Sequence, residues 1–131
     1  MPKHLLIADD EPSILAVLRI FFERQGYRVS CARHGQVALD LARQDPPDLM
    51  IIDIQMPVKD GIAVIAELRA DARFASTPAI ALTGFSREFV PSTLLQAGFT
   101  HALAKPLEFS ELRAVVNSLI GGAGAPRALT I

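Results

Sequence analysis

The feature that most constrains the fold of this chain is the alternation of short apolar runs with stretches of helical periodicity. Several of the apolar runs lack polar alternation, which is typical of strands buried on both faces of a parallel sheet. The runs that have the length of a strand are residues 4–8, 27–32, 48–53, 78–83 and 100–104.

Between these runs, apolar residues recur with the period of an amphipathic helix, as in residues 14–22, 37–42, 62–68 and 112–119. The repeat of strand and helix predicts an α/β fold, a doubly wound (βα)5 three-layer sandwich with a five-stranded parallel sheet. A further helical segment, residues 86–99, carries Pro91 in its middle, so this helix either starts late or is kinked. Because proline is tolerated at the first helical position, we predict that this helix begins at Pro91.

The composition excludes several classes of protein. The chain has 131 residues, 50% of them hydrophobic and 21% charged, which is enough for a buried core and unlike a disordered tail. A net charge of -1 predicts no direct binding to nucleic acid or to an anionic membrane. The apolar runs are too short to span a bilayer, and we see no secretory signal peptide. The single cysteine, Cys31, suits a reducing compartment, so we expect a cytoplasmic protein.

The chain divides into two parts. We expect residues 1–121 to form one domain, because the strand–helix pattern ends at Gly121. Residues 122–131 are rich in glycine and alanine, and we expect a flexible C-terminal tail or linker.

Polar residues stand at the ends of four of the predicted strands: Asp9 and Asp10, Asp53, Thr83 and Lys105. In an open parallel sheet, ligands bind beyond the carboxyl ends of the strands, so these side chains are expected to converge. Carboxylates gathered there repel one another and need a positive partner. Mg2+ prefers such oxygen ligands, and Lys105 is a second cation. Together with the hydroxyl of Thr83, these are the groups that phosphoryl transfer requires.

Simpler interpretations stay open for each residue taken alone. An Asp-Asp pair before a helix can cap it and favour its dipole. Asp53 can be an ordinary turn residue, and Thr83 with Gly84 an ordinary exit from a strand.

Four motifs occur in this order on the strand–helix units: "ADDEP", "DIQMPVKDG", "LTG" and "AKP". Together they resemble the response-regulator receiver domain (CheY-like) of two-component signal transduction, over roughly residues 3–121. The resemblance implies a flavodoxin-like sheet with the strand order 2-1-3-4-5.

The resemblance also implies roles for the acidic residues. Asp53 would accept a phosphoryl group from a phosphohistidine of a sensor histidine kinase or a histidine phosphotransfer protein. Asp10, Asp53 and the main-chain carbonyl of Gln55 would bind Mg2+ directly, and Asp9 through a bound water. Gly61 would permit the loop after Asp53 to return tightly into the third helix.

The switch is implied in the same way. Lys105 would contact the phosphoryl group, Thr83 would move to hydrogen-bond it, and the bond from Lys105 to Pro106 would be cis. The family often has an aromatic residue where this chain has Ala102, so coupling through a ring is not expected here. Phe85, at the rim of the site, would shield the acyl phosphate and slow its hydrolysis.

The expected function is that of a phosphoacceptor in a phosphorelay. The surface around the fourth helix, fifth strand and fifth helix would then change for a downstream protein or a fused output domain. The domain would catalyse only its own phosphorylation and dephosphorylation, so it is not expected to be an enzyme. We expect a monomer or a weak phosphorylation-dependent homodimer.

Three alternatives remain. A degenerate receiver would act as an interaction module without phosphorylation. A haloacid-dehalogenase-like phosphatase needs a nucleophile and an acid two residues apart after the first strand, whereas Asp9 and Asp10 are adjacent. A flavodoxin-like binder of a flavin phosphate is disfavoured, because the acidic residues after the first strand would repel the phosphate.

Overall fold

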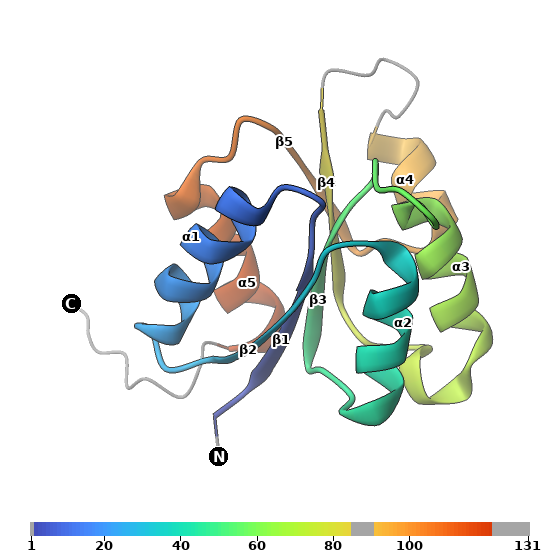
Figure 1. Ribbon diagram of the computed structural model, residues 1–131, viewed down its shortest axis with the longest axis horizontal. Coiled ribbons are helices and arrows are strands. Elements are labelled where there is room, and N and C mark those ends of the chain that lie inside the picture. The colour runs from blue at the N-terminus through green and yellow to red at the C-terminus, as the bar shows by residue number, and fades with distance from the viewer. Residues whose placement is uncertain (1, 85–90, 122–131) are drawn as a thin grey trace.

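The structure, a computed structural model, describes residues 2–84 and 91–121. Five parallel strands form one sheet in the order β2-β1-β3-β4-β5. Helices α1 and α5 cover one face of the sheet, and α2, α3 and α4 cover the other (Figure 1). The predicted fold class and the strand order implied by the family resemblance are both confirmed.

The predicted strands agree with the observed ones to within a residue at each end. The strands are β1 (His4–Ala8), β2 (Arg28–Ala32), β3 (Leu49–Asp53), β4 (Ala79–Thr83) and β5 (His101–Ala104). The helices are α1 (Pro12–Glu23), α2 (Gly35–Gln44), α3 (Gly61–Ala70), α4 (Pro91–Ala97) and α5 (Phe109–Ile120), with a short 3-10 helix η1 (Ala72–Phe74) that the periodicity did not predict.

The central strands are apolar because both of their faces are covered. Every residue of β1 and of β3 is buried. Leu5 and Ile7 point into the core layer beneath α1 and α5, whereas Leu6 and Ala8 point into the layer beneath α2, α3 and α4. Two apolar layers therefore explain why these runs show no polar alternation.

The helix ends follow the expected chemistry. Pro12 occupies the first turn of α1, and Gly121 ends α5 with a φ of 72°, a left-handed conformation that suits glycine. The structure describes α4 from Pro91 onward, and the residues that would test whether the helix begins there lie outside the described ones. Residues 85–90 and the predicted tail, residues 122–131, lie outside the described residues.

Among the described residues, no helix has both the length and the apolar character that a bilayer span requires.

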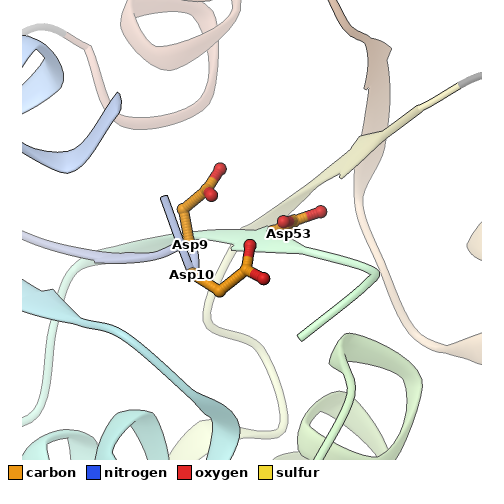
Figure 2. A group of neighbouring side chains, drawn as sticks. All are labelled: Asp9, Asp10 and Asp53. Atoms are coloured by element: carbon orange, nitrogen blue, oxygen red, sulfur yellow. The ribbon is translucent and has the colours of Figure 1, made fainter. Parts of the chain in front are cut away.

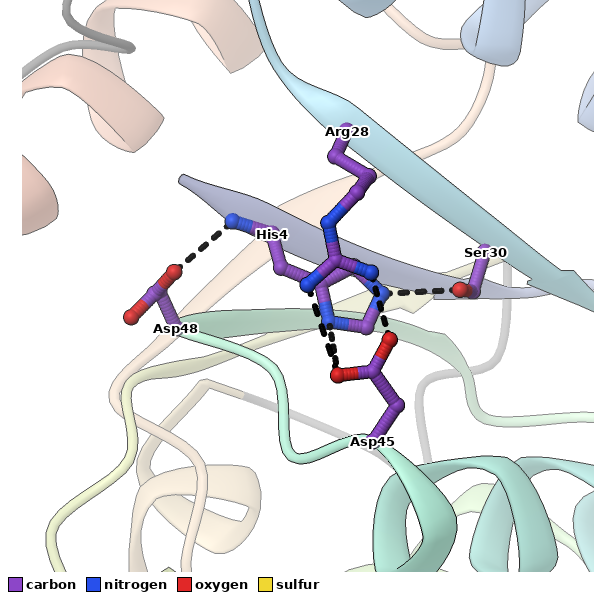
Figure 3. Close-up of polar contacts among 5 residues, drawn as sticks. All are labelled: His4, Arg28, Ser30, Asp45 and Asp48. Atoms are coloured by element: carbon purple, nitrogen blue, oxygen red, sulfur yellow. Dashed lines mark hydrogen bonds and ion pairs between the residues drawn. The ribbon is translucent and has the colours of Figure 1, made fainter. Parts of the chain in front are cut away.

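A polar cluster at the amino end of the sheet joins β1, β2 and the loop before β3 (Figure 3). The imidazole of His4 is 2% exposed, and its Nε2 lies 2.7 Å from Oγ of Ser30. The main-chain N of His4 donates to Oδ2 of Asp48 at 2.7 Å. Nδ1 of His4 lies 3.9 Å from Oδ1 of Asp45, which pairs with Arg28. The cluster is therefore a structural element, at the end of the sheet opposite to the acidic residues.

Replacement of His4 by alanine should destabilise the protein, because it opens a cavity and leaves the hydroxyl of Ser30 without its partner. We expect the free energy of unfolding, measured with urea, to fall by about 2–3 kcal/mol. His101→Ala, at an exposed position of the edge strand β5, is the control and should change it by less than about 0.5 kcal/mol. Equal losses in the two variants would contradict this assignment.

Candidate functional site

The carboxyl edge of the sheet brings together Asp9, Asp10 and Asp53 (Figure 2). One carboxylate oxygen from each lies within 4.8 Å of the others. Asp53 is the last residue of β3, and Asp9 and Asp10 follow β1, its parallel neighbour, so the two strands end side by side. Asp9 and Asp53 are buried, and Asp10 is exposed. The predicted convergence of these acids is therefore present.

Lys105, from the end of β5, reaches into the same cluster. Its Nζ lies 2.9 Å from Oδ2 of Asp9, 3.3 Å from Oδ2 of Asp53 and 3.5 Å from Oε1 of Glu11. Burial lowers the pKa of Lys105, but the carboxylates of Asp9 and Asp53 raise it by more, so the pKa lies above its ordinary value. The ammonium group is therefore a permanent charge at this edge.

One ammonium group does not balance the acids around it. Oδ1 of Asp9 accepts from the main-chain N of Glu11 at 2.9 Å. Oδ2 of Asp9 is close enough to Lys105 for an ion pair, but it has no hydrogen bond of good geometry from any described residue. Its one charged partner among the described residues, Lys105, is shared with Asp53 and Glu11, so the acids outnumber the cation and leave a place for a second one.

Asp53 has a strongly perturbed pKa. Burial raises the pKa of its carboxyl, and the negative charge of Asp9 raises it further. The main-chain N of Gln55, 3.2 Å from Oδ1, and the ammonium of Lys105 act in the opposite direction. The resulting pKa is about 6, so proton loss from Asp53 is sensitive to any further positive charge.

These observations fit a hard divalent cation. Three carboxylates supply the oxygen ligands that Mg2+ prefers, and the exposed Asp10 leaves room for water on the open side. Gln55 lines the same pocket. A cation there would oppose both causes of the raised pKa of Asp53, first its burial and then the charge of Asp9.

Other predicted residues lie close by. Thr83, the last residue of β4, is half-buried, and its carbonyl accepts from the main-chain N of Lys105 at 2.7 Å. The peptide bond between Lys105 and Pro106 is cis, as the resemblance implied. Ala102 lies opposite Ala81 of β4 and packs against the core, so no ring occupies that position. Phe85 lies outside the described residues.

The loop after Asp53 returns tightly, as expected of Gly61. The N of Gly61 donates to the carbonyl of Ile54 at 2.9 Å, and a Cβ atom on Gly61 would lie 2.6 Å from the carbonyl oxygen of Asp53. Val58, at the turn of the loop, has a φ of 69°, which is strained for a β-branched residue.

The sequence did not reveal the apolar wall of the pocket. Ile14, Val17 and Phe109 line it together with the acids, and Val17 is 48% exposed. Helical spacing leaves Val17 off the core face of α1, and only the fold shows that this outward-facing residue lies at the pocket. The contact of Glu11 with Lys105 was also missed, although this residue stands directly after the Asp-Asp pair.

The amino-acid sequence matches the response regulator receiver domain over residues 5–117. The chain belongs to this family. It is thus a receiver domain of two-component signalling, the signalling module of response regulators.

Two relatives illustrate the range of architectures. The polar-differentiation response regulator DivK of Brucella anthropi is 32% identical over 123 residues, which cover 94% of this chain and all of DivK. Response regulator GtcR of Aneurinibacillus migulanus is 40% identical over 115 residues, which cover 88% of this chain but 46% of GtcR. The receiver domain therefore spans one of these relatives entirely and about half of the other.

Two solved structures share the fold. The receiver domain of the sensor histidine kinase PA1611 from Pseudomonas aeruginosa is 30% identical, with a TM-score of 0.84, and covers 92% of this chain and 99% of its own. That structure has a magnesium ion coordinated in its active-site cleft. Chemotaxis response regulator CheY4 of Vibrio cholerae is 26% identical, with a TM-score of 0.85, and covers 92% of this chain and all of its own.

The raised pKa of Asp53 predicts how stability depends on pH in metal-free protein. Between the ordinary value of 3.8 and about 6, the folded protein retains a proton that the unfolded chain has lost. The free energy of unfolding should therefore fall as the pH rises through this window, by up to about 3 kcal/mol.

Urea unfolding in the presence of a chelator, at a series of pH values, checks this dependence. Asp53→Asn cannot ionise, so it should lack this decrease and be more stable than wild type at pH 7. Parallel pH profiles for the two proteins would show that Asp53 titrates normally.

Proposed function

We propose that this receiver domain accepts a phosphoryl group on the carboxylate of Asp53 from a phosphohistidine. The observation that carries the proposal is the gathering of Asp9, Asp10 and Lys105 around a buried Asp53 that opens to a pocket. A carboxylate in this setting has a cation beside it and lines a pocket from which a donor could reach it.

The step is a displacement at phosphorus. A carboxylate oxygen of Asp53 forms the new P–O bond while the P–N bond to the donor imidazole breaks, and the electron pair of that bond stays on the imidazole nitrogen. The attacking group must be ionised, which requires a pH above its pKa of about 6 or a cation beside it. Oδ1 already accepts the N–H of Gln55, so that bond orients the carboxylate.

The residues around Asp53 stabilise the charge that develops on the phosphoryl oxygens. Lys105, with its Nζ 3.3 Å from Oδ2 of Asp53, is placed to contact one of these oxygens. The hydroxyl of Thr83, at the end of the neighbouring strand, is proposed to donate to another.

Asp10, Asp53 and the carbonyl of Gln55 would hold Mg2+ directly, and Asp9 would hold it through a water. The bound ion would neutralise charge on the phosphoryl group during transfer. The magnesium in the PA1611 receiver domain and the fit of the acids here support this assignment.

The phosphorylated domain would act by changing the surface of α4, β5 and α5. With Ala102 in place of an aromatic residue, the movement of Thr83 would reach this surface without a ring. The donor would be a sensor histidine kinase or a histidine phosphotransfer protein in the cytoplasm, and the output a downstream protein or a fused domain. The phosphatase alternative is not favoured, because the family match and the buried acceptor after β3 both point to a receiver.

Acetyl phosphate with Mg2+ tests the acceptor. Intact mass spectrometry should show one phosphoryl adduct on wild type and on the control Asp40→Asn, whose carboxyl is exposed on α2, but none on Asp53→Asn. A chelator should abolish the adduct. An adduct on Asp53→Asn would move the acceptor elsewhere, and no adduct on any protein would favour a degenerate receiver. Size-exclusion chromatography of the same samples would detect a phosphorylation-dependent dimer.

The rate of phosphate loss tests the role of Phe85. If a bulky apolar side chain two residues after Thr83 excludes water, wild type should lose the adduct slowly and Phe85→Glu several-fold faster. The decay of the adduct is followed by the same mass measurement. An unchanged or slower decay in the variant would rule out shielding by Phe85.

A further inference from the structure

Gly35, the first residue of α2, is in close contact with the loop that follows Asp53. A Cβ atom built on Gly35 would lie 2.0 Å from the carbonyl oxygen of Lys59 and 2.7 Å from its Cβ. Folded proteins essentially never show Cβ contacts below 3.0 Å, and the atoms concerned belong to main chain or lie next to it. The backbone of Lys59 therefore occupies the place where any other side chain would begin.

The helix itself does not need glycine at this position. The φ of Gly35 lies outside the left-handed region, so an L-residue can adopt its conformation. Alanine is a better helix former than glycine. The contact with Lys59 is therefore the physical reason that glycine fits here.

The loop has little freedom to give way. Its base is closed by hydrogen bonds from the N of Ile54 to the carbonyl of Leu82 and from the N of Gly61 to the carbonyl of Ile54, both 2.9 Å. At the turn, the N of Lys59 donates to the carbonyl of Pro57 at 2.7 Å across Val58, which is already strained at a φ of 69°. A displacement of Lys59 must therefore be absorbed along residues 55–60, the segment that contains Gln55.

We propose that Gly35 is a positioning residue for the metal site: by admitting the backbone of Lys59, it sets the loop so that the carbonyl of Gln55 can serve as a metal ligand. The inference rests on the proposed function, which makes Gln55 a ligand. A methyl group at position 35 would push Lys59 by about 1 Å, and outer contacts that orient ligands change metal affinity by about 10- to 100-fold.

The test compares Gly35→Ala with wild type and with Gln36→Ala, which introduces alanine at the next position of the same helix. Mg2+ is titrated into each protein and followed by amide resonances in NMR spectra. We expect Gly35→Ala to weaken Mg2+ binding by at least about ten-fold, and Gln36→Ala to bind as wild type does. In metal-free protein, the amide resonances of residues 55–60 should shift in Gly35→Ala alone.

If Gly35→Ala does not fold, as judged by circular dichroism, the Mg2+ affinity of the double variant Gly35→Ala/Val58→Gly is compared with that of Val58→Gly. Glycine at position 58 lets the loop move away from the new methyl group without strain. The double variant should fold but bind Mg2+ weakly.

Each outcome separates the two proposals. Unchanged Mg2+ affinity in Gly35→Ala, with normal binding by wild type, would overturn the role of Gly35 and leave the proposed function intact. An absence of Mg2+ binding by wild type would overturn the proposed function, and with it the role of Gly35 in holding a metal ligand.

Discussion

The structure depends on one electrostatic constraint, the repulsion among carboxylates at the carboxyl end of the two central strands. Asp9 and Asp53 are buried there, within reach of Asp10, and Lys105 is the ammonium group that enters the cluster from β5. A single cation among several acids leaves a negative site; burial, and after it the charge of Asp9, raises the pKa of Asp53 there. The same imbalance that destabilises the metal-free protein makes the site suited to a divalent cation and to a phosphoryl group.

The rest of the fold holds this imbalance in place. Two apolar layers fix the central strands, so the acids cannot move apart without disrupting the core. At the opposite end of β1, His4 joins this strand to β2 through Ser30 and to the loop before β3 through Asp48. The loop that closes over Asp53 is set by glycines at two points, Gly61 at its return and Gly35 on the helix against which it packs. The apolar layers and the His4 cluster thus stabilise the fold, whereas the two glycines set the geometry of the site. Because the stability comes from elsewhere, the site can keep its unfavourable group of carboxylates.

Much of the architecture follows from local pattern. The strand runs were predicted to within a residue, and in the central strands burial on both faces demands unbroken apolar sequence. The convergence of Asp10, Asp53 and Lys105 followed from a general property of parallel sheets, whose strand ends share one edge. The strand order came from the family motifs. Periodicity placed Leu18 on the apolar stripe of α1 and left Val17 off it, and Leu18 is buried whereas Val17 is exposed.

The sequence by itself determined the kinds of groups available: acids after two strands, a lysine after the last, and apolar runs that must be buried. Only the tertiary structure decided that Lys105 also contacts Glu11, that Val17 forms a wall of the pocket, and that Gly35 lies against Lys59. The reason is physical. Strand ends are placed by the topology of the sheet, which local patterns reveal. Contacts between loops and helix ends depend on how distant segments pack, and a local sequence pattern does not predict that packing.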